Sequence, residues 1–441
     1  MSEFAKKRRC PSVCSGCKIR CHRKSEDPIA PADAVELLFA QVEPQTRVES
    51  IPLPASLNRV TAHDVPSPAG YPEHVSNIHD GLLINVDEAE GLFGEDGKVH
   101  LAPGSFERTG MDAMFDARWN AIAPLEICTF EDDGTVTLER LPLKGSGLTE
   151  PDSLIRQGET LVPGGSSLIP CRLEILAFMG VTEVDVLAKP RVGIVAVGDD
   201  LVPYDAPLAL GQKHEANSFL LRGIVEECGG EVVSVEIVPD DASSISASLV
   251  AAAHDCDMVI VTGGLGRFGE EYGGDCTVEA IESVGHVYHV GVALGPGGKC
   301  CLVGSVEGKP LLGMPGPPHA CLTLSEVVVP LAMQKFLGVY RYGRPTVTAR
   351  VENNWIKVPA AEGEELPKPA PVDAVWGFST THGKMERRAA LRREGDSFVA
   401  VMGRQGETAA VFGTSQCVIS SDSWGDDSVT VQLLVDPRDI K

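Results

Sequence analysis

The hydrophobic pattern between Pro190 and Gly338 alternates between two periods. Short runs of apolar and β-branched residues, typical of buried strands, cover residues 191–197, 231–238, 258–261, 286–293 and 310–313. Helical spacing covers residues 217–228, 243–253 and 322–337, and a further helical pattern begins at Thr277. Strands that alternate with helices of this length predict a parallel sheet that is covered on both faces.

Polar and glycine-rich segments follow three of these strands. They are Gly198-Asp199-Asp200, Thr262-Gly263-Gly264 and Met314-Pro315-Gly316. In open α/β sheets, ligands bind beyond the carboxyl ends of the strands. Glycines there let backbone N–H groups approach a phosphate, and the N-terminus of the next helix favours negative charge. The sequence therefore predicts an anion site around the Gly-Gly turn.

The flanking regions have other patterns. The spacing of Val35, Leu38 and Val42 predicts an amphipathic helix over residues 31–42. Period-two stretches at 397–402 and 428–434 predict strands in a β-rich C-terminal region that begins near Gly343. Residues 359–371 are rich in Pro, Glu and Ala, which indicates a loop or linker.

Length and composition limit the class of protein. A chain of 441 residues exceeds one usual domain and predicts three or four. Its apolar runs stay well short of the roughly 18 residues that a membrane span needs, and its N-terminus lacks an apolar signal core, so we expect a cytoplasmic protein with no membrane partner. The thirteen cysteines fit a reducing compartment better than a disulfide framework.

The net charge of −24 argues against nucleic acid as a partner, because phosphate binding needs an extended basic face. A small phosphate-rich ligand would need backbone N–H groups and a divalent cation to offset the negative field.

Residues 1–24 differ from the rest of the chain. Eight Lys and Arg against one Glu give this tail +7, which leaves −31 for the remainder. The motif Cys10-x3-Cys14-x2-Cys17-x3-Cys21 places four thiols close together, and the basic neighbours favour the thiolate form that metals bind. A disordered basic tail is the alternative. We predict a zinc site or an iron–sulfur cluster with an accessory role, and the choice between them stays open.

A resemblance to a known family rests on motifs in order. Thr262-Gly-Gly-Leu-Gly266, followed by Asp275-x-Thr-x-Glu-Ala280, resembles the signature of the molybdopterin-binding superfamily, the MogA/MoaB-like domain. The segment from Ile51 to Val65 is similar to the N-terminal segment of the MoeA/gephyrin E-domain family, the molybdopterin molybdenumtransferases. Other matching positions are Asp80-Gly81, Thr109-Gly110, Gly198-Asp-Asp-Leu201, Asn217, Pro239-Asp-Asp241 and Met314-Pro-Gly316, so the resemblance covers residues 30–441 and excludes the tail.

The resemblance implies an α/β multidomain fold. It comprises a MogA/MoaB-like parallel-sheet domain, mainly β N-terminal lobes and a C-terminal β-barrel. The expected parts are a tail (1–27), an elongated N-terminal domain (28–66 and 145–189), a small β lobe (67–144), the molybdopterin-binding domain (190–338) and the barrel domain (339–441). It also implies a homodimer in which Asp80 and Thr109 of one chain approach the site of the other.

The implied activity is the insertion of molybdate into adenylylated molybdopterin with release of AMP, assisted by Mg²⁺. Asp275 matches the family's catalytic acid and would hold the metal or orient the attacking oxygen, with Asp240 as a second candidate acid. Asp275 could instead cap a helix, Asp240-Asp241 could form an ordinary turn, and Asn217 could cap its helix. The implied substrate-binding residues are Asp80, Thr109, Asp199, Asn217, Thr262, Gly263, Gly264, Pro296, Gly297, Lys299, Pro315 and Gly316.

The chain departs from the family pattern in three loops. Gly266 stands where the family has serine, Gly295-Pro-Gly-Gly-Lys299 replaces Lys-Pro-Gly-Lys, and Pro315-Gly-Pro-Pro318 replaces Pro-Gly-Asn-Pro. Two other functions therefore stay open. A molybdopterin adenylyltransferase or CinA-like nucleotide hydrolase shares the glycine turn but lacks the segment matched at 51–65. A non-catalytic pterin-binding scaffold fits the missing serine and lysine.

Overall fold

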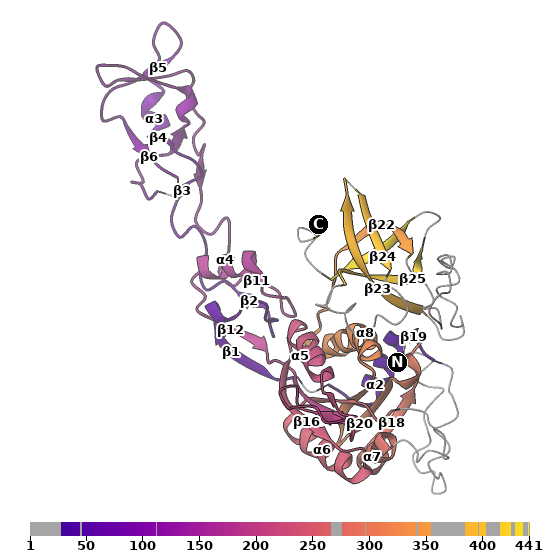
Figure 1. Cartoon of the computed structure of the whole chain (residues 1–441). Coiled ribbons are helices and arrows are strands. Elements are labelled where there is room, and N and C mark those ends of the chain that lie inside the picture. Colours follow the sequence, from indigo (N-terminus) through magenta and orange to yellow (C-terminus); the bar gives the residue numbers. More distant parts are fainter. Residues whose placement is uncertain are drawn as a thin grey trace. The chain divides into compact units, whose positions relative to one another are not determined.

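The structure is a computed structural model that describes residues 28–44, 46–111, 113–265, 276–295, 297–340, 343–353, 384–395, 397–402, 415–424, 428–434 and 440. Asp275, Pro296, the linker 359–371 and the four tail cysteines lie outside these ranges. The chain divides into two compact units (Figure 1). Of the described residues, unit 1 contains those up to Arg47 and those from Ala188 onward, and unit 2 contains those between Val48 and Leu187.

A six-stranded sheet forms the centre of unit 1, with strand order β16-β13-β17-β21-β20-β18. The first four strands run parallel to one another, as predicted. Their bounds are Glu231–Val238 for β16, Arg191–Val197 for β13, Met258–Thr262 for β17 and Lys309–Met314 for β21. Apolar side chains fill both faces of β17, which is buried along its whole length.

The predicted parallel sheet is confirmed for these four strands, but at one edge the sheet is mixed. Strand β20 (Leu302–Val306) runs antiparallel to both β21 and β18 (Gly285–Val290). A two-residue turn joins β20 to β21, and Glu307 (φ 47°) and Gly308 (φ 73°) both adopt the left-handed conformation that such hairpins require. The strand expected at 286–293 ends at Val290, before Gly291 (φ 115°).

Helices cover both faces of this sheet (Figure 1). α6 (Ala242–Asp255) and α7 (Cys276–Val284) lie on one face, and α2 (Pro31–Gln41), α5 (Asn217–Glu227) and α8 (Pro318–Leu337) lie on the other. Within the described ranges, α8 is the one helix long and apolar enough to cross a membrane. Of its most apolar window, 61% is buried inside the protein, as in a core helix.

Unit 1 also contains the predicted β-barrel. Its five strands are β22 (Thr346–Asn353), β23 (Lys384–Glu394), β24 (Ser397–Met402), β25 (Cys417–Trp424) and β26 (Val429–Leu433). They pair in the order β23-β24-β22-β26-β25, and β25 pairs back to β23, which closes the barrel. Ala389, Leu391, Ile419 and Val431 belong to its buried core. The short strand β19 (Leu294–Gly295) pairs with the start of β23.

Unit 2 has two main apolar cores. One includes Leu53, Leu168 and Leu176, and its elements are β1 (Val48–Pro52), η2 (Leu53–Ala55), β2 (Val65–Pro66), β11 (Thr160–Val162), α4 (Pro170–Phe178) and β12 (Glu183–Leu187). The other includes Leu82 and Leu138, and its elements are β4 (Gly81–Ile84), α3 (Val86–Ala89), β5 (Val99–Leu101), β6 (Phe106–Thr109), β7 (Ala121–Ala123), η3 (Leu125–Ile127), β8 (Cys128–Phe130) and β9 (Val136–Leu138). The short strands β3 (Ser76–Asn77) and β10 (Leu148–Thr149) pair with each other.

One expected boundary is placed differently by the structure. The sequence predicts one domain from residues 28–66 and 145–189, whereas the described residues up to Arg47 lie in unit 1. The reason is burial: Ala34, Val35 and Leu38 lie on the inner side of α2, which packs against α8. The other domain boundaries stay predictions.

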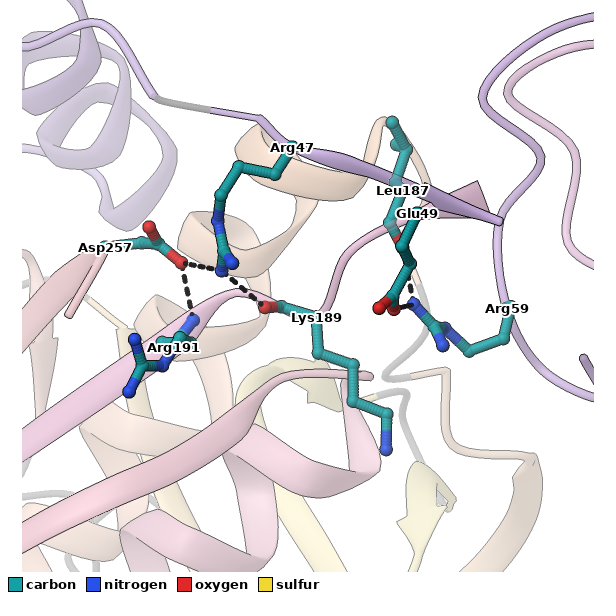
Figure 2. A network of polar contacts seen from close by, with 7 residues as sticks. All are labelled: Arg47, Glu49, Arg59, Leu187, Lys189, Arg191 and Asp257. Atoms are coloured by element: carbon teal, nitrogen blue, oxygen red, sulfur yellow. Dashed lines mark hydrogen bonds and ion pairs between the residues drawn. The ribbon is translucent and has the colours of Figure 1, made fainter. Parts of the chain in front are cut away.

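The chain passes between the units at residues 47–48 and 187–188, and polar contacts hold both segments within each unit (Figure 2). In unit 1, Arg47 donates to Asp257 Oδ2 at 3.0 Å, and the same oxygen accepts the Arg191 N–H at 2.8 Å. In unit 2, Arg59 pairs with Glu49 and donates to the Leu187 carbonyl at 2.8 Å. Within each unit, these polar contacts hold the chain segments next to residues 47–48 and 187–188.

Candidate functional site

A pocket of about 580 Å³ lies at the carboxyl ends of β13, β16, β17 and β21, within unit 1. This is the edge where the sequence predicted a ligand. The turns after these strands and the segment before α5 form its walls. The lining residues are Ala196, Val197, Gly198, Asp199, Asp200, Leu201, Lys213, His214, Glu215, Ala216, Asn217, Asp240, Thr262, Gly263, Gly264, Gly316, Pro317 and Pro318.

The Gly263-Gly264 turn needs glycine at both positions. Both residues have positive φ, 95° and 62°. A Cβ atom on Gly263 would overlap the Val197 carbonyl, and one on Gly264 would overlap Thr277 Oγ1. The Gly263 N–H donates to the Met314 carbonyl at 3.2 Å, whereas the Gly264 N–H makes no hydrogen bond within the described part of the chain. One backbone donor of the turn is therefore available to a ligand.

Asn217 connects this turn to the neighbouring loop. Its Nδ2 donates to Thr262 Oγ1 and to the Gly316 carbonyl, both at 2.9 Å. Thr262 Oγ1 in turn donates to the Pro315 carbonyl at 3.3 Å, so its lone pair accepts from Asn217. Because the carbonyl of Gly316 can only accept, this network fixes the orientation of the amide. Asn217 is the first residue of α5 rather than its cap, so the simple capping role does not apply.

The two neighbouring aspartates after β16 have different roles. Asp241 caps α6: its Oδ1 accepts the Ser244 N–H at 2.9 Å, and hydrogen bonds from Ser244 lower its pKa. Asp240 lines the pocket, and its N–H donates to Asp199 Oδ1 at 3.0 Å. Burial raises the pKa of Asp240, and the charges of Asp199 and Asp200 raise it further. The pocket therefore concentrates negative charge beside the glycine turn.

The arrangement of carboxylates indicates which residues could hold the expected Mg²⁺ ion. Among the described residues, no group of three or more His, Cys, Asp or Glu side chains is placed to hold a metal ion. Mg²⁺ is commonly held by one or two carboxylates together with the phosphates of a substrate. Asp199 and Asp240 are the residues that could act in this way, because both line the pocket and a Cβ atom on Gly264 would lie only 3.1 Å from Asp240 Oδ1.

The structure brings most predicted site residues together. Asp199, Asn217, Asp240, Thr262, Gly263, Gly264 and Gly316 line the pocket, and Pro315 contributes its carbonyl to the network behind it. Gly297 and Lys299 lie at η5 (Gly298–Cys300) and do not line the pocket. Asp80 and Thr109 lie in unit 2, where Thr109 pairs with Gly81 between β6 and β4.

Sequence reasoning missed three titratable lining residues, Lys213, His214 and Glu215. Glu215 is buried and accepts from the N–H and hydroxyl of Ser218 at the start of α5. The signal that could have identified them is their position as a run of titratable residues directly before that helix.

Comparison with known proteins agrees with this geometry. Residues 193–334 match the family described as a probable molybdopterin binding domain, which defines the class of the sheet and its pocket. Over 319 residues the chain is 27% identical to the molybdopterin molybdenumtransferase of Haemophilus influenzae, covering 70% of this chain and 78% of that protein. It is 26% identical over 325 residues to molybdopterin molybdenumtransferase 2 of Mycobacterium tuberculosis, covering 70% and 80%.

The fold is that of a solved relative. The crystal structure of the molybdopterin biosynthesis MoeA protein from Pyrococcus horikoshii superposes with a TM-score of 0.67 at 23% identity, covering 93% of this chain and 100% of that one. The chain is thus similar in sequence to molybdopterin molybdenumtransferases and similar in fold to a MoeA protein.

Proposed function

We propose that the protein inserts molybdate into adenylylated molybdopterin and releases AMP, as a transferase of molybdenum cofactor biosynthesis. The observation that carries this proposal is the glycine turn beside a carboxylate-lined pocket, in a chain that resembles named molybdopterin molybdenumtransferases over 70% of its length. Water cleaves the phosphoanhydride bond of the substrate, which leaves AMP and the phosphate of molybdopterin, and the dithiolene sulfurs bind molybdenum in exchange for molybdate oxygens that leave as water.

The glycine turn, Asn217 and the aspartates have different roles in the proposed reaction. The Gly264 N–H binds a phosphate oxygen, and Asn217 holds the turn and the Gly316 loop at a fixed separation. Asp199 and Asp240, together with Asp275, would hold the Mg²⁺ ion. When bound, that ion neutralises the charge of the phosphates.

Purified protein incubated with adenylylated molybdopterin, Mg²⁺ and molybdate tests the proposal. A transferase releases AMP only when molybdate is present. AMP release without molybdate would instead identify a nucleotide hydrolase, and pterin binding without AMP release would identify a scaffold. An adenylyltransferase would form the adenylylated substrate from molybdopterin and a nucleotide.

We expect Asp275→Asn to lower turnover by about a hundredfold or more while changing the melting temperature little, because asparagine can still cap a helix but lacks the charge that a divalent cation needs. Steady-state AMP release and thermal unfolding measure the two quantities. Normal turnover by the variant would reduce Asp275 to a helix cap.

We also propose a cytoplasmic homodimer in which the lobe that carries Asp80 and Thr109 completes the site of the second chain. Sedimentation velocity of the active protein should show a dimer at working concentrations. A fully active monomer would contradict the shared site.

The tail cysteines Cys10, Cys14, Cys17 and Cys21 are proposed to bind zinc or an iron–sulfur cluster. Anaerobically purified protein should contain zinc or iron that a version lacking residues 1–24 does not. Molybdate-dependent AMP release should persist in the shortened version, because the tail is expected to be an accessory. Equal metal content in the two proteins would exclude the tail site.

A further inference from the structure

The pocket contains a lysine that the proposed mechanism does not use. Lys213 is the one lysine or arginine among its described lining residues, whereas Asp199, Asp200, Glu215 and Asp240 supply four carboxylates. We propose that Lys213 is an anion-binding residue of this site, which exchanges its contact with Asp200 for a phosphate group of the ligand. The proposal rests on the proposed function, since it names a further substrate-binding residue of the same pocket.

The backbone places Lys213 at the pocket. Strand β14 (Leu201–Val202) follows directly on the turn at Gly198, and β15 (Lys213–His214) pairs with it. The Lys213 N–H donates to the Asp200 carbonyl at 2.9 Å, and the Glu215 N–H donates to the Val202 carbonyl at 2.8 Å. These bonds hold the lysine beside the carboxyl end of β13.

The side chain is held only weakly. Lys213 Nζ lies 2.7 Å from Asp200 Oδ2, with 65% of the lysine side chain and 44% of the aspartate side chain exposed. Ion pairs this exposed contribute little stability, because water and salt screen them. A phosphate offers more negative charge and several acceptor oxygens, so it can replace the carboxylate.

The negative charge of the pocket would favour this exchange of partners by Lys213. Asp199 and Asp200 already repel the ionised form of Asp240, and an incoming phosphate meets the same negative field. Lys299, the loop lysine that was expected to bind substrate, does not line the pocket. Lys213 therefore supplies the cationic side chain that the described part of the site otherwise lacks.

Titration of inorganic pyrophosphate into the full chain by calorimetry, at low ionic strength with and without Mg²⁺, tests the proposal. Lys213→Met should weaken binding by about ten- to a hundredfold, because a charge-assisted hydrogen bond is lost, and Lys213→Arg should restore most of it. The matched control is Lys335→Met: Lys335 pairs with Glu36 away from the pocket, and its loss should leave binding unchanged.

A double-mutant cycle with Asp200→Asn separates direct contact from screening. If Lys213 binds the ligand, Asp200→Asn should tighten pyrophosphate binding, and Lys213→Met should still weaken it in that background. If Lys213 only neutralises Asp200, the lysine substitution would have no effect once Asp200 is gone, which would overturn the inference. Failure of the wild type to bind pyrophosphate under either condition would overturn it as well.

The AMP-release assay distinguishes this inference from the proposed function. Molybdate-dependent AMP release by the wild type, with unchanged KM and pyrophosphate affinity in Lys213→Met, would support the function and refute the role of Lys213. Pyrophosphate binding that depends on Lys213 in a protein that releases no AMP would do the opposite.

Discussion

Gly263→Ala is expected to abolish measurable AMP release and to lower the melting temperature. Gly263 has φ 95°, a conformation that costs an L-residue about 1–2 kcal/mol. Its new methyl group would also overlap the Val197 carbonyl, which belongs to a strand and cannot move freely. Relief of this overlap would displace the turn, and with it Gly264, which lines the pocket. AMP release and thermal unfolding measure the two effects.

Gly338→Ala is the matched control for backbone strain. Gly338 caps α8 with φ 71°, and an added Cβ would meet nothing within 4 Å. This variant should lose stability through φ alone and keep its activity. If Gly263→Ala were as active and as stable as Gly338→Ala, the turn would tolerate a side chain and the close approach to Val197 would have no functional meaning.

Asp240→Asn is expected to lower turnover by about ten- to a hundredfold while slightly raising the melting temperature at neutral pH. Burial, Asp199 and Asp200 raise the pKa of Asp240 in the folded protein. A carboxyl with a raised folded-state pKa opposes folding when it is ionised, and this penalty is complete above the folded pKa. Asparagine removes the penalty, but it also removes a charge that a divalent cation would use.

The pH dependence supplies the check. As the pH falls through the raised pKa towards 3.8, Asp240 becomes protonated in the wild type, so its stability should approach that of Asp240→Asn. Asp241→Asn is the neighbouring control. Hydrogen bonds lower the pKa of Asp241, so its charge favours folding at neutral pH, and its loss should reduce stability slightly and spare activity. Full turnover by Asp240→Asn would show that the reaction does not need the charge of Asp240.

The sequence was most informative where apolar periodicity was strong. Strand β16 was predicted at its observed bounds, Glu231–Val238, and helix α5 to within one residue. Strand β20 was missed because its hairpin turn is Glu307-Gly308, whereas Asn or Asp before glycine is the usual signal. Missing one hairpin was enough to make a mixed sheet look parallel.

At the site, residue types could be predicted but not their orientation. Asp240 and Asp241 are chemically identical in sequence, and only the start of α6 decides which one caps the helix and which one faces the pocket. Lys213 looked like any solvated lysine, because its place beside Asp200 depends on the pairing of β14 with β15. Contacts of this kind form through tertiary structure, so local sequence patterns do not reveal them.

The two positions where the chain passes between the units, 47–48 and 187–188, show how unit 2 is placed in the sequence of unit 1. Val48 and Leu187, the two ends of unit 2, are partners in the β1–β12 ladder, and the flanking Ala188 N–H donates to the Arg47 carbonyl at 2.7 Å. Unit 2 is thus an insertion whose two ends meet, so a simple splice of Arg47 to Ala188 would preserve the path of unit 1. Insertions with adjacent ends can be gained, lost or exchanged with little disturbance of the host fold. The sheet that carries the glycine turn is therefore complete without unit 2.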